Sequence, residues 1–139
     1  PQPERTKAHM FKLFSLQEAN KLIPTVDTLL SDMQNAINDA LRLRQEFTEL
    51  KANSLEARNL IQEMQFLGRV VNENKAQLDK LGVFIQDIDT GKIDFPSQFG
   101  GEVVYLTWQK GNNAITHYHR LNEGTSLPLP KNQRQAELA

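Results

Sequence analysis

The pattern of apolar and polar residues in the first half of the chain predicts two long helices. Apolar residues recur at steps of three and four over residues 19–47 and again over 57–81, which is the spacing of one face of an α-helix. Ser15 and Glu18 have the spacing of a capping box at the start of the first helix. Two such helices joined by a short link predict an antiparallel helical hairpin over residues 15–81.

Three residues mark special points in this helical pattern. Pro24 lies inside the first helix, where its ring collides with a carbonyl four residues earlier, so we expect a kink or a short break near residues 20–24. Ser54 is the expected N-cap of the second helix. Gly68 stands opposite Ala36 in the predicted hairpin. A glycine inside a helix lowers the stability of the helix by about 1 kcal/mol relative to alanine, so its presence suggests that the two helices approach each other closely there. The alternative is that this glycine is merely tolerated.

The second half of the chain changes to a period of two residues, which predicts short strands. Residues 83–95 predict one β-hairpin, because two alternating runs flank a turn that ends at Gly91. Residues 102–121 predict a second hairpin, because runs rich in β-branched and aromatic residues flank a Gly-Asn pair at 111–112. We expect a connecting loop over residues 96–101.

These elements predict the α+β class, with a long antiparallel helical hairpin followed by a small antiparallel sheet of two β-hairpins. We expect a single domain over residues 14–126, with the helical hairpin at 15–81 and the β-hairpins at 83–121. The chain ends are polar and contain prolines. They predict a disordered N-terminal tail over residues 1–13 and an extended C-terminal tail over 127–139.

The composition excludes several classes of function. The chain has 16 Lys+Arg against 17 Asp+Glu, so its charge gives no global attraction to nucleic acid or anionic membrane. Without cysteine, it has no disulfide, thiolate metal site or cysteine nucleophile. No apolar run approaches the roughly 20 residues that span a bilayer. Basic residues near the helical turn are interleaved with glutamates, which is typical of a solvated helix face. We expect a cytoplasmic protein that binds neither nucleic acid nor membrane.

The second β-hairpin carries the best candidate site. A turn centred on the Gly-Asn pair at 111–112, with a loop of two or four residues, places His119 opposite Val104. A loop of three or five residues would flip one strand to the other face. With the expected turn, alternation puts one set of side chains on a common face. This set is Val104, Leu106, Trp108, Ile115, His117 and His119.

His117 and His119 on one strand face are suited to reach a metal ion, since imidazole is a common metal ligand. Asp87, Asp94 and Glu123 are the candidate carboxylates. Asp87 is favoured for this metal site, because the first hairpin puts it on an apolar face, where an acid needs a partner such as a histidine. The candidate ligand-binding residues are Trp108, His117, His119, Asp87 and Asp94.

The alternative interpretation is that both histidines make ordinary hydrogen bonds and that Trp108 anchors the core. The sequence has no phosphate-cradling glycine loop, no G-x-S-x-G elbow and no H-E-x-x-H helix. We therefore expect no organic cofactor, with a divalent metal as the alternative, and enzymatic activity stays open.

Several sequence blocks follow one another in an order that is similar to a known family. They are FSLQEANKLIP at 14–24, LGV at 81–83, DFP at 94–96, EVVYLTW at 102–108 and the Tyr118-His119 pair. In this order they resemble the bacterial family called domain of unknown function 2203, over residues 14–129. The resemblance implies a small intracellular bacterial protein and brings no established activity, substrate or catalytic residue.

The chain departs from the pattern of that family at two positions. A Trp-His pair is more usual where Tyr118 and His119 stand, and an arginine commonly follows the glycine that matches Gly124. Here residues 125–128 are Thr-Ser-Leu-Pro. An anion-binding role of such an arginine is therefore not carried over to this chain.

Apolar residues off the main stripes give the helices more apolar surface than one hairpin covers. They are Leu29, Leu41, Leu43, Leu50, Phe66 and Val70. We therefore expect homodimerisation through the helical arms as a four-helix bundle. The leading hypothesis is a non-enzymatic homodimeric interaction module whose sheet supports an unknown protein partner or small ligand. The alternative is a small metal- or ligand-binding protein, with hydrolytic chemistry, that uses the His117/His119 strand face.

Overall fold

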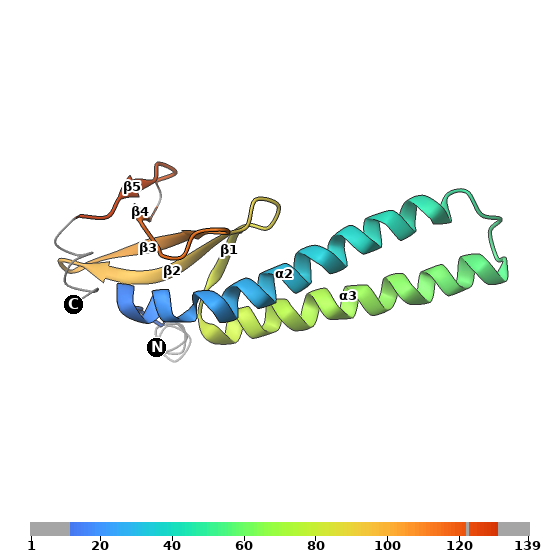
Figure 1. Ribbon diagram of the computed structural model, residues 1–139, viewed down its shortest axis with the longest axis horizontal. Coiled ribbons are helices and arrows are strands. Elements are labelled where there is room, and N and C mark those ends of the chain that lie inside the picture. The colour runs from blue at the N-terminus through green and yellow to red at the C-terminus, as the bar shows by residue number, and fades with distance from the viewer. Residues whose placement is uncertain (1–11, 122, 131–139) are drawn as a thin grey trace, which may run out of the picture. The chain divides into compact units, whose positions relative to one another are not determined.

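Two helices are followed by a five-stranded antiparallel sheet in the computed structural model, which describes residues 12–121 and 123–130 (Figure 1). This arrangement confirms the α+β class and the helical hairpin. The helices are α2 (Leu16–Phe47) and α3 (Leu55–Leu81). The strands are β1 (Phe84–Asp87), β2 (Lys92–Phe99), β3 (Glu102–Gln109), β4 (His117–Arg120) and β5 (Leu127–Pro128), and they pair in chain order.

The described residues group into two compact units. The sheet unit comprises α2 up to Asp27 and the chain from Leu78 onward. The helical unit comprises Thr28–Gln77 and therefore holds the remainder of α2 and most of α3.

Side chains at the helix ends make the capping contacts that the sequence predicts. The amide of Ser15 donates to Glu18 Oε1 at 2.9 Å, and the amide of Glu18 donates to Ser15 Oγ at 3.0 Å. Ser54 Oγ accepts a hydrogen bond from the amide of Ala57 at 3.1 Å, so Ser54 caps α3. Gly82 ends α3 with a φ of 90°, as a glycine C-cap does.

The first helix passes through Pro24 without interruption over its 32 residues. The expected short break near residues 20–24 is therefore absent, whereas continued helical structure is confirmed. A proline removes one backbone hydrogen bond of the helix. Here its ring is exposed while the neighbouring Ile23 and Val26 are buried, so packing of these side chains holds the helix together across the proline.

The core of the sheet unit lies between the start of α2 and the inner face of the sheet. The rings of Phe14 and Phe95 meet edge to face with centroids 5.4 Å apart. The amide of Phe14 also donates to the carbonyl of Pro96 at 2.7 Å. These contacts tie the chain just before α2 to β2. The other fully buried members of this core include Leu16, Ala19, Val26, Ile93, Val104, Leu106 and Trp108.

The second strand is longer than the sequence predicts, because β2 continues through Pro96. The expected loop over residues 96–101 is wrong, since the turn is confined to the glycines 100–101, which have φ values of 53° and 84°. Proline is tolerated where a strand has no neighbour on one side. β1 pairs with β2 only as far as Asp94, so Pro96 lies beyond the reach of that ladder.

The chain after β4 also departs from its prediction. Residues 127–139 are predicted to form a tail, but Leu127 pairs with Tyr118 in the sheet. Leu129 is 2 % exposed, and its amide donates to the carbonyl of Thr116 at 2.8 Å. The beginning of the expected tail is therefore part of the sheet unit. Most of the N-terminal tail and residues 131–139 lie outside the described residues.

Candidate functional site

The outer face of the sheet carries both histidines of the hairpin formed by β3 and β4. His117 lies opposite Thr107, and His119 lies opposite Tyr105. Trp108 follows Thr107 directly, so its side chain points to the inner face, where it is 1 % exposed. The expected grouping of the histidines with Trp108 is therefore wrong, and the interpretation of Trp108 as a core anchor is confirmed.

A seven-residue connection, residues 110–116, separates β3 from β4 and explains the flipped face. An odd number of loop residues reverses the face that the second strand presents. The indole N–H of Trp108 donates to the carbonyl of Asn112 at 2.8 Å within this loop. The side chain of Asn20, on α2, accepts a hydrogen bond from the amide of Ile115 at 2.9 Å. Contacts between distant segments therefore hold the long loop in place.

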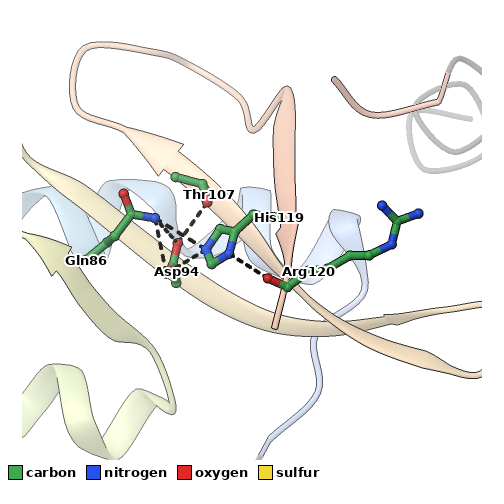
Figure 2. A network of polar contacts seen from close by, with 5 residues as sticks. All are labelled: Gln86, Asp94, Thr107, His119 and Arg120. Carbon is green, nitrogen blue, oxygen red and sulfur yellow. Dashed lines mark hydrogen bonds and ion pairs between the residues drawn. The ribbon is translucent and has the colours of Figure 1, made fainter. Parts of the chain in front are cut away.

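A buried carboxylate on β2 is the centre of a polar network on the outer face (Figure 2). Asp94 is 6 % exposed. It accepts hydrogen bonds from the hydroxyl of Thr107 at 2.8 Å and from the side-chain amide of Gln86 at 3.1 Å. Its other oxygen, Oδ2, lies 3.0 Å from Nε2 of His119. Three strands thus contribute donors to one carboxylate, as a buried charge requires.

Both nitrogens of the His119 ring have contacts within the protein. Nε2 lies 3.0 Å from the carboxylate oxygen of Asp94 and 3.3 Å from the side-chain nitrogen of Gln86. Nδ1 lies 3.2 Å from the carbonyl oxygen of Arg120. The ring is therefore held from both sides by neighbouring groups of the same chain.

Two aromatic rings cover one side of this network. The ring of Tyr105 lies 5.2 Å from that of His119, and the ring of Phe84 meets Tyr105 edge to face at 6.0 Å. Apolar cover of this kind reduces the access of water to the pair formed by Asp94 and His119. Reduced solvation strengthens a hydrogen bond between the two groups.

A hollow of about 450 Å³ opens beside the network on the same unit. We call it the polar hollow. Lys92 and His117 contribute basic side chains to its wall, and no aspartate or glutamate is among the described residues that line it. The complete lining is Gln86, Lys92, Thr107, Gln109, Asn112, Thr116, His117, His119, Gly124 and Ser126.

Asp87 is the last residue of β1 and lies away from the partners that the sequence suggests for it. Its Oδ2 accepts a hydrogen bond from the hydroxyl of Thr90 at 2.7 Å, and its Oδ1 accepts one from the amide of Asp89 at 3.2 Å. The hydrogen bond from Thr90 is the main reason why the pKa of the Asp87 carboxyl lies below its usual value. Asp94, the other aspartate among the candidates, is the one that contacts a histidine.

The described part of the chain does not bring His117, His119 and Asp87 together as metal ligands, and no group of three His, Cys, Asp or Glu residues in it is placed to hold a metal ion. Strict alternation puts Asp87 on the face of Ile85, but a β-bulge between these two residues breaks the alternation. Gln86 joins the Asp94 network at this bulge. Neither Gln86 nor Thr107 is a candidate from the sequence, and a bulge leaves no signal in a hydrophobic pattern.

Another concave surface lies in the helical unit and is mostly apolar. It measures about 270 Å³ and lies between α2 and α3. We call it the apolar groove. The exposed fraction of Leu41 on its wall is 57 %, which is high for a leucine. The lining is Ile37, Ala40, Leu41, Arg44, Met64, Leu67, Gly68 and Val71.

Gly68 lies in this groove and meets open space. Outside its chain neighbours and the backbone of its own helix, a Cβ atom placed on Gly68 has no described atom within 4 Å. The prediction that this glycine allows close approach to Ala36 within the hairpin is therefore wrong. The buried residues of α2 in this region are Met33, Ala36 and Leu43. The buried face of α2 therefore does not cover Gly68, and the groove stays open.

No helix in the described residues is long and apolar enough to cross a membrane.

Comparisons with known proteins agree with the resemblance in the sequence. A search of curated proteins and a search of solved structures each found no match. A family model described as uncharacterized conserved protein (DUF2203) matches residues 12–127. This match covers both helices and the strands up to the start of β5, so the chain belongs to the DUF2203 family of uncharacterized conserved proteins.

Proposed function

We propose that the chain is a non-enzymatic interaction module that forms a homodimer through the apolar groove of its helical unit. The observation that carries this proposal is the groove itself, where apolar side chains from two helices surround an empty space. Exposed apolar surface of this kind marks interaction sites in soluble proteins.

The spacing of the groove residues supports a second copy of the chain as the occupant. Each wall repeats residues at positions i, i+3, i+4 and i+7, which is the stripe that one helix presents to another. A surface that carries both the ridges and the groove can pair with itself about a twofold axis. The two walls are Ile37, Ala40, Leu41 and Arg44 from α2, and Met64, Leu67, Gly68 and Val71 from α3.

Gly68 adds a second argument for a helix in the groove. A glycine in a helix interior costs about 1 kcal/mol relative to alanine. Nothing in the hairpin uses the space that this glycine leaves, because an added Cβ meets no described atom within 4 Å. A helix of a second copy that packs over Gly68 gains a close backbone approach, which offsets the cost.

The contacts of His119 support a positioning role for this side chain rather than a catalytic one. A general base needs a ring nitrogen that faces the substrate. Both ring nitrogens of His119 instead face groups within the protein, the Asp94 carboxylate and the Gln86 amide at Nε2 and the Arg120 carbonyl at Nδ1. The network therefore serves to position side chains beside the polar hollow.

A matched pair of variants tests the proposed dimer. Leu41 and Phe66 are 57 % and 56 % exposed, so glutamate at either position leaves the fold of one chain intact. Leu41 lines the groove, whereas Phe66 is two residues from Gly68 and lies about 200° around α3 from it. Sedimentation velocity is expected to show that Leu41→Glu is monomeric and that Phe66→Glu remains a dimer. Equal behaviour of the two variants would contradict the proposed interface.

The alternative function is metal binding by His117, His119 and Asp87. The geometry favours it less, because the described residues do not bring these three side chains together. Elemental analysis of untagged protein purified without chelator tests it, alongside the His117→Ala/His119→Ala double variant. Stoichiometric metal in the parent, and none in a folded double variant, would replace the proposal of a purely interacting module.

A further inference from the structure

We propose that the polar hollow binds a small molecule that carries both an anionic group and hydroxyl groups, as a sugar phosphate does. Lys92 and His117 face the anion, and the hydroxyl and amide side chains of the lining face the hydroxyls. This site goes beyond the proposed dimer and does not depend on it, because all of its residues belong to the sheet unit.

The hollow is assembled from segments that are far apart in the sequence. Its volume of about 450 Å³ lies within the range of about 300–1,000 Å³ for small-molecule sites. Its side chains come from β1, β2, β3, β4 and the chain before β5. Its uncharged hydrogen-bonding groups are the hydroxyls of Thr107, Thr116 and Ser126 and the amides of Gln86, Gln109 and Asn112.

The charge of the hollow selects the anionic group. Lys92 is positive at neutral pH, and no carboxylate is among the described lining residues. Two carboxylates lie nearby. Asp94 is paired with His119 at 3.0 Å. Asp87 lies opposite Lys92 in the sheet register, and after the hydrogen bonds from Thr90 and Asp89 the charge of Lys92 also contributes to the lowered pKa of its carboxyl. Among the side chains that line the hollow, an anion meets Lys92 and His117 and no carboxylate.

Several lining side chains are held in place before any ligand arrives. Asp94 holds Thr107 and Gln86 by hydrogen bonds and contacts His119 (Figure 2). Nδ1 of His117 lies 2.9 Å from the hydroxyl of Thr116, so among the described contacts its Nε2 is left for a ligand. Groups that are fixed beforehand lose little conformational entropy on binding, and this raises the affinity.

Hydrogen-bonding capacity distinguishes this ligand class from a bare metal ion. Hydroxyl and amide groups both donate and accept, which matches the hydroxyls of a sugar. Hard divalent cations prefer carboxylate oxygens, and the described lining has none. The hollow is therefore better suited to an anionic polyol than to a cation.

Calorimetric titration of the full chain with ribose 5-phosphate, ribose and inorganic phosphate tests the proposal. We expect ribose 5-phosphate to bind most tightly, because it engages both the basic wall and the hydroxyl groups. Lys92→Gln should weaken its binding about tenfold, the effect of losing one charged hydrogen bond, and His117→Gln should weaken it by removing the imidazole. Lys80→Gln, which removes an exposed lysine of α3 outside the hollow, should leave binding unchanged.

Three results would overturn the proposal. The first is that none of the probes binds at millimolar concentration. The second is that the Lys92, His117 and Lys80 variants lose affinity to the same degree, which would indicate unspecific attraction of charge. The third is that ribose 5-phosphate binds no better than inorganic phosphate, because the hydroxyl groups of the lining would then play no part. Circular dichroism of each variant establishes that it is folded.

Discussion

Replacing Asp94 with alanine tests the polar network of the outer sheet face. The substitution removes the acceptor of Thr107, Gln86 and His119. A hydrogen bond to a charged group contributes about 1.5–3 kcal/mol, and a buried polar group left without its partner costs about 1–3 kcal/mol. The side chain of Asp94 is only 9 % exposed, so its donors have little access to water once it is removed. We expect Asp94→Ala to destabilise the protein by about 3 kcal/mol.

Chemical denaturation followed by circular dichroism measures this loss. Parent and variant are compared at one protein concentration, because the stability of a dimer depends on concentration. Asp87→Ala is the control, since that carboxylate makes its hydrogen bonds in an exposed turn, and we expect a much smaller loss. A loss below about 1 kcal/mol for Asp94→Ala would refute the reasoning, because solvated ion pairs fall in that range.

The remaining predictions concern a core residue, a groove residue and a helix cap. Trp108→Ala should cost about 3–5 kcal/mol in denaturation experiments, because a buried indole leaves a large cavity. Gly68→Ala should not destabilise a single chain and should gain up to about 1 kcal/mol, since an added Cβ meets open space; a loss of stability in a monomeric background would contradict this. Hydrogen bonding to the Ser15 amide lowers the pKa of Glu18 from its ordinary value of 4.5. The stability difference between parent and Glu18→Gln should therefore be present at neutral pH and disappear as the pH falls through the lowered pKa, as thermal unfolding at several pH values will measure.

Local interactions account for the parts of the fold that the sequence predicts. The capping box of Ser15 and Glu18 and the cap at Ser54 each depend on residues within a few positions. Apolar periodicity predicts the two helices for the same reason, because its spacing reflects one element at a time. Pro24 shows the limit of this reasoning, since buried neighbours sustain the helix across it.

Contacts between distant segments explain the parts that the sequence does not predict. Asn20 on α2 holds the loop at Ile115, and the odd length of that loop turns His117 and His119 to the outer face. The bulge in β1 brings Gln86 rather than Asp87 to the network. Neither feature is visible in periodicity or in turn propensity. The sequence therefore predicts that the candidate site lies on the β-hairpins, but it does not predict which side chains contact one another there.

The oligomeric state of the untagged parent tests the central claim most directly. Multi-angle light scattering during size-exclusion chromatography, over a concentration series up to tens of micromolar, gives the molar mass without assuming a shape. The account predicts twice the mass of one chain, with dissociation toward a single chain on dilution. A mass of one chain at every concentration would contradict the proposed homodimer and leave the apolar groove without its occupant.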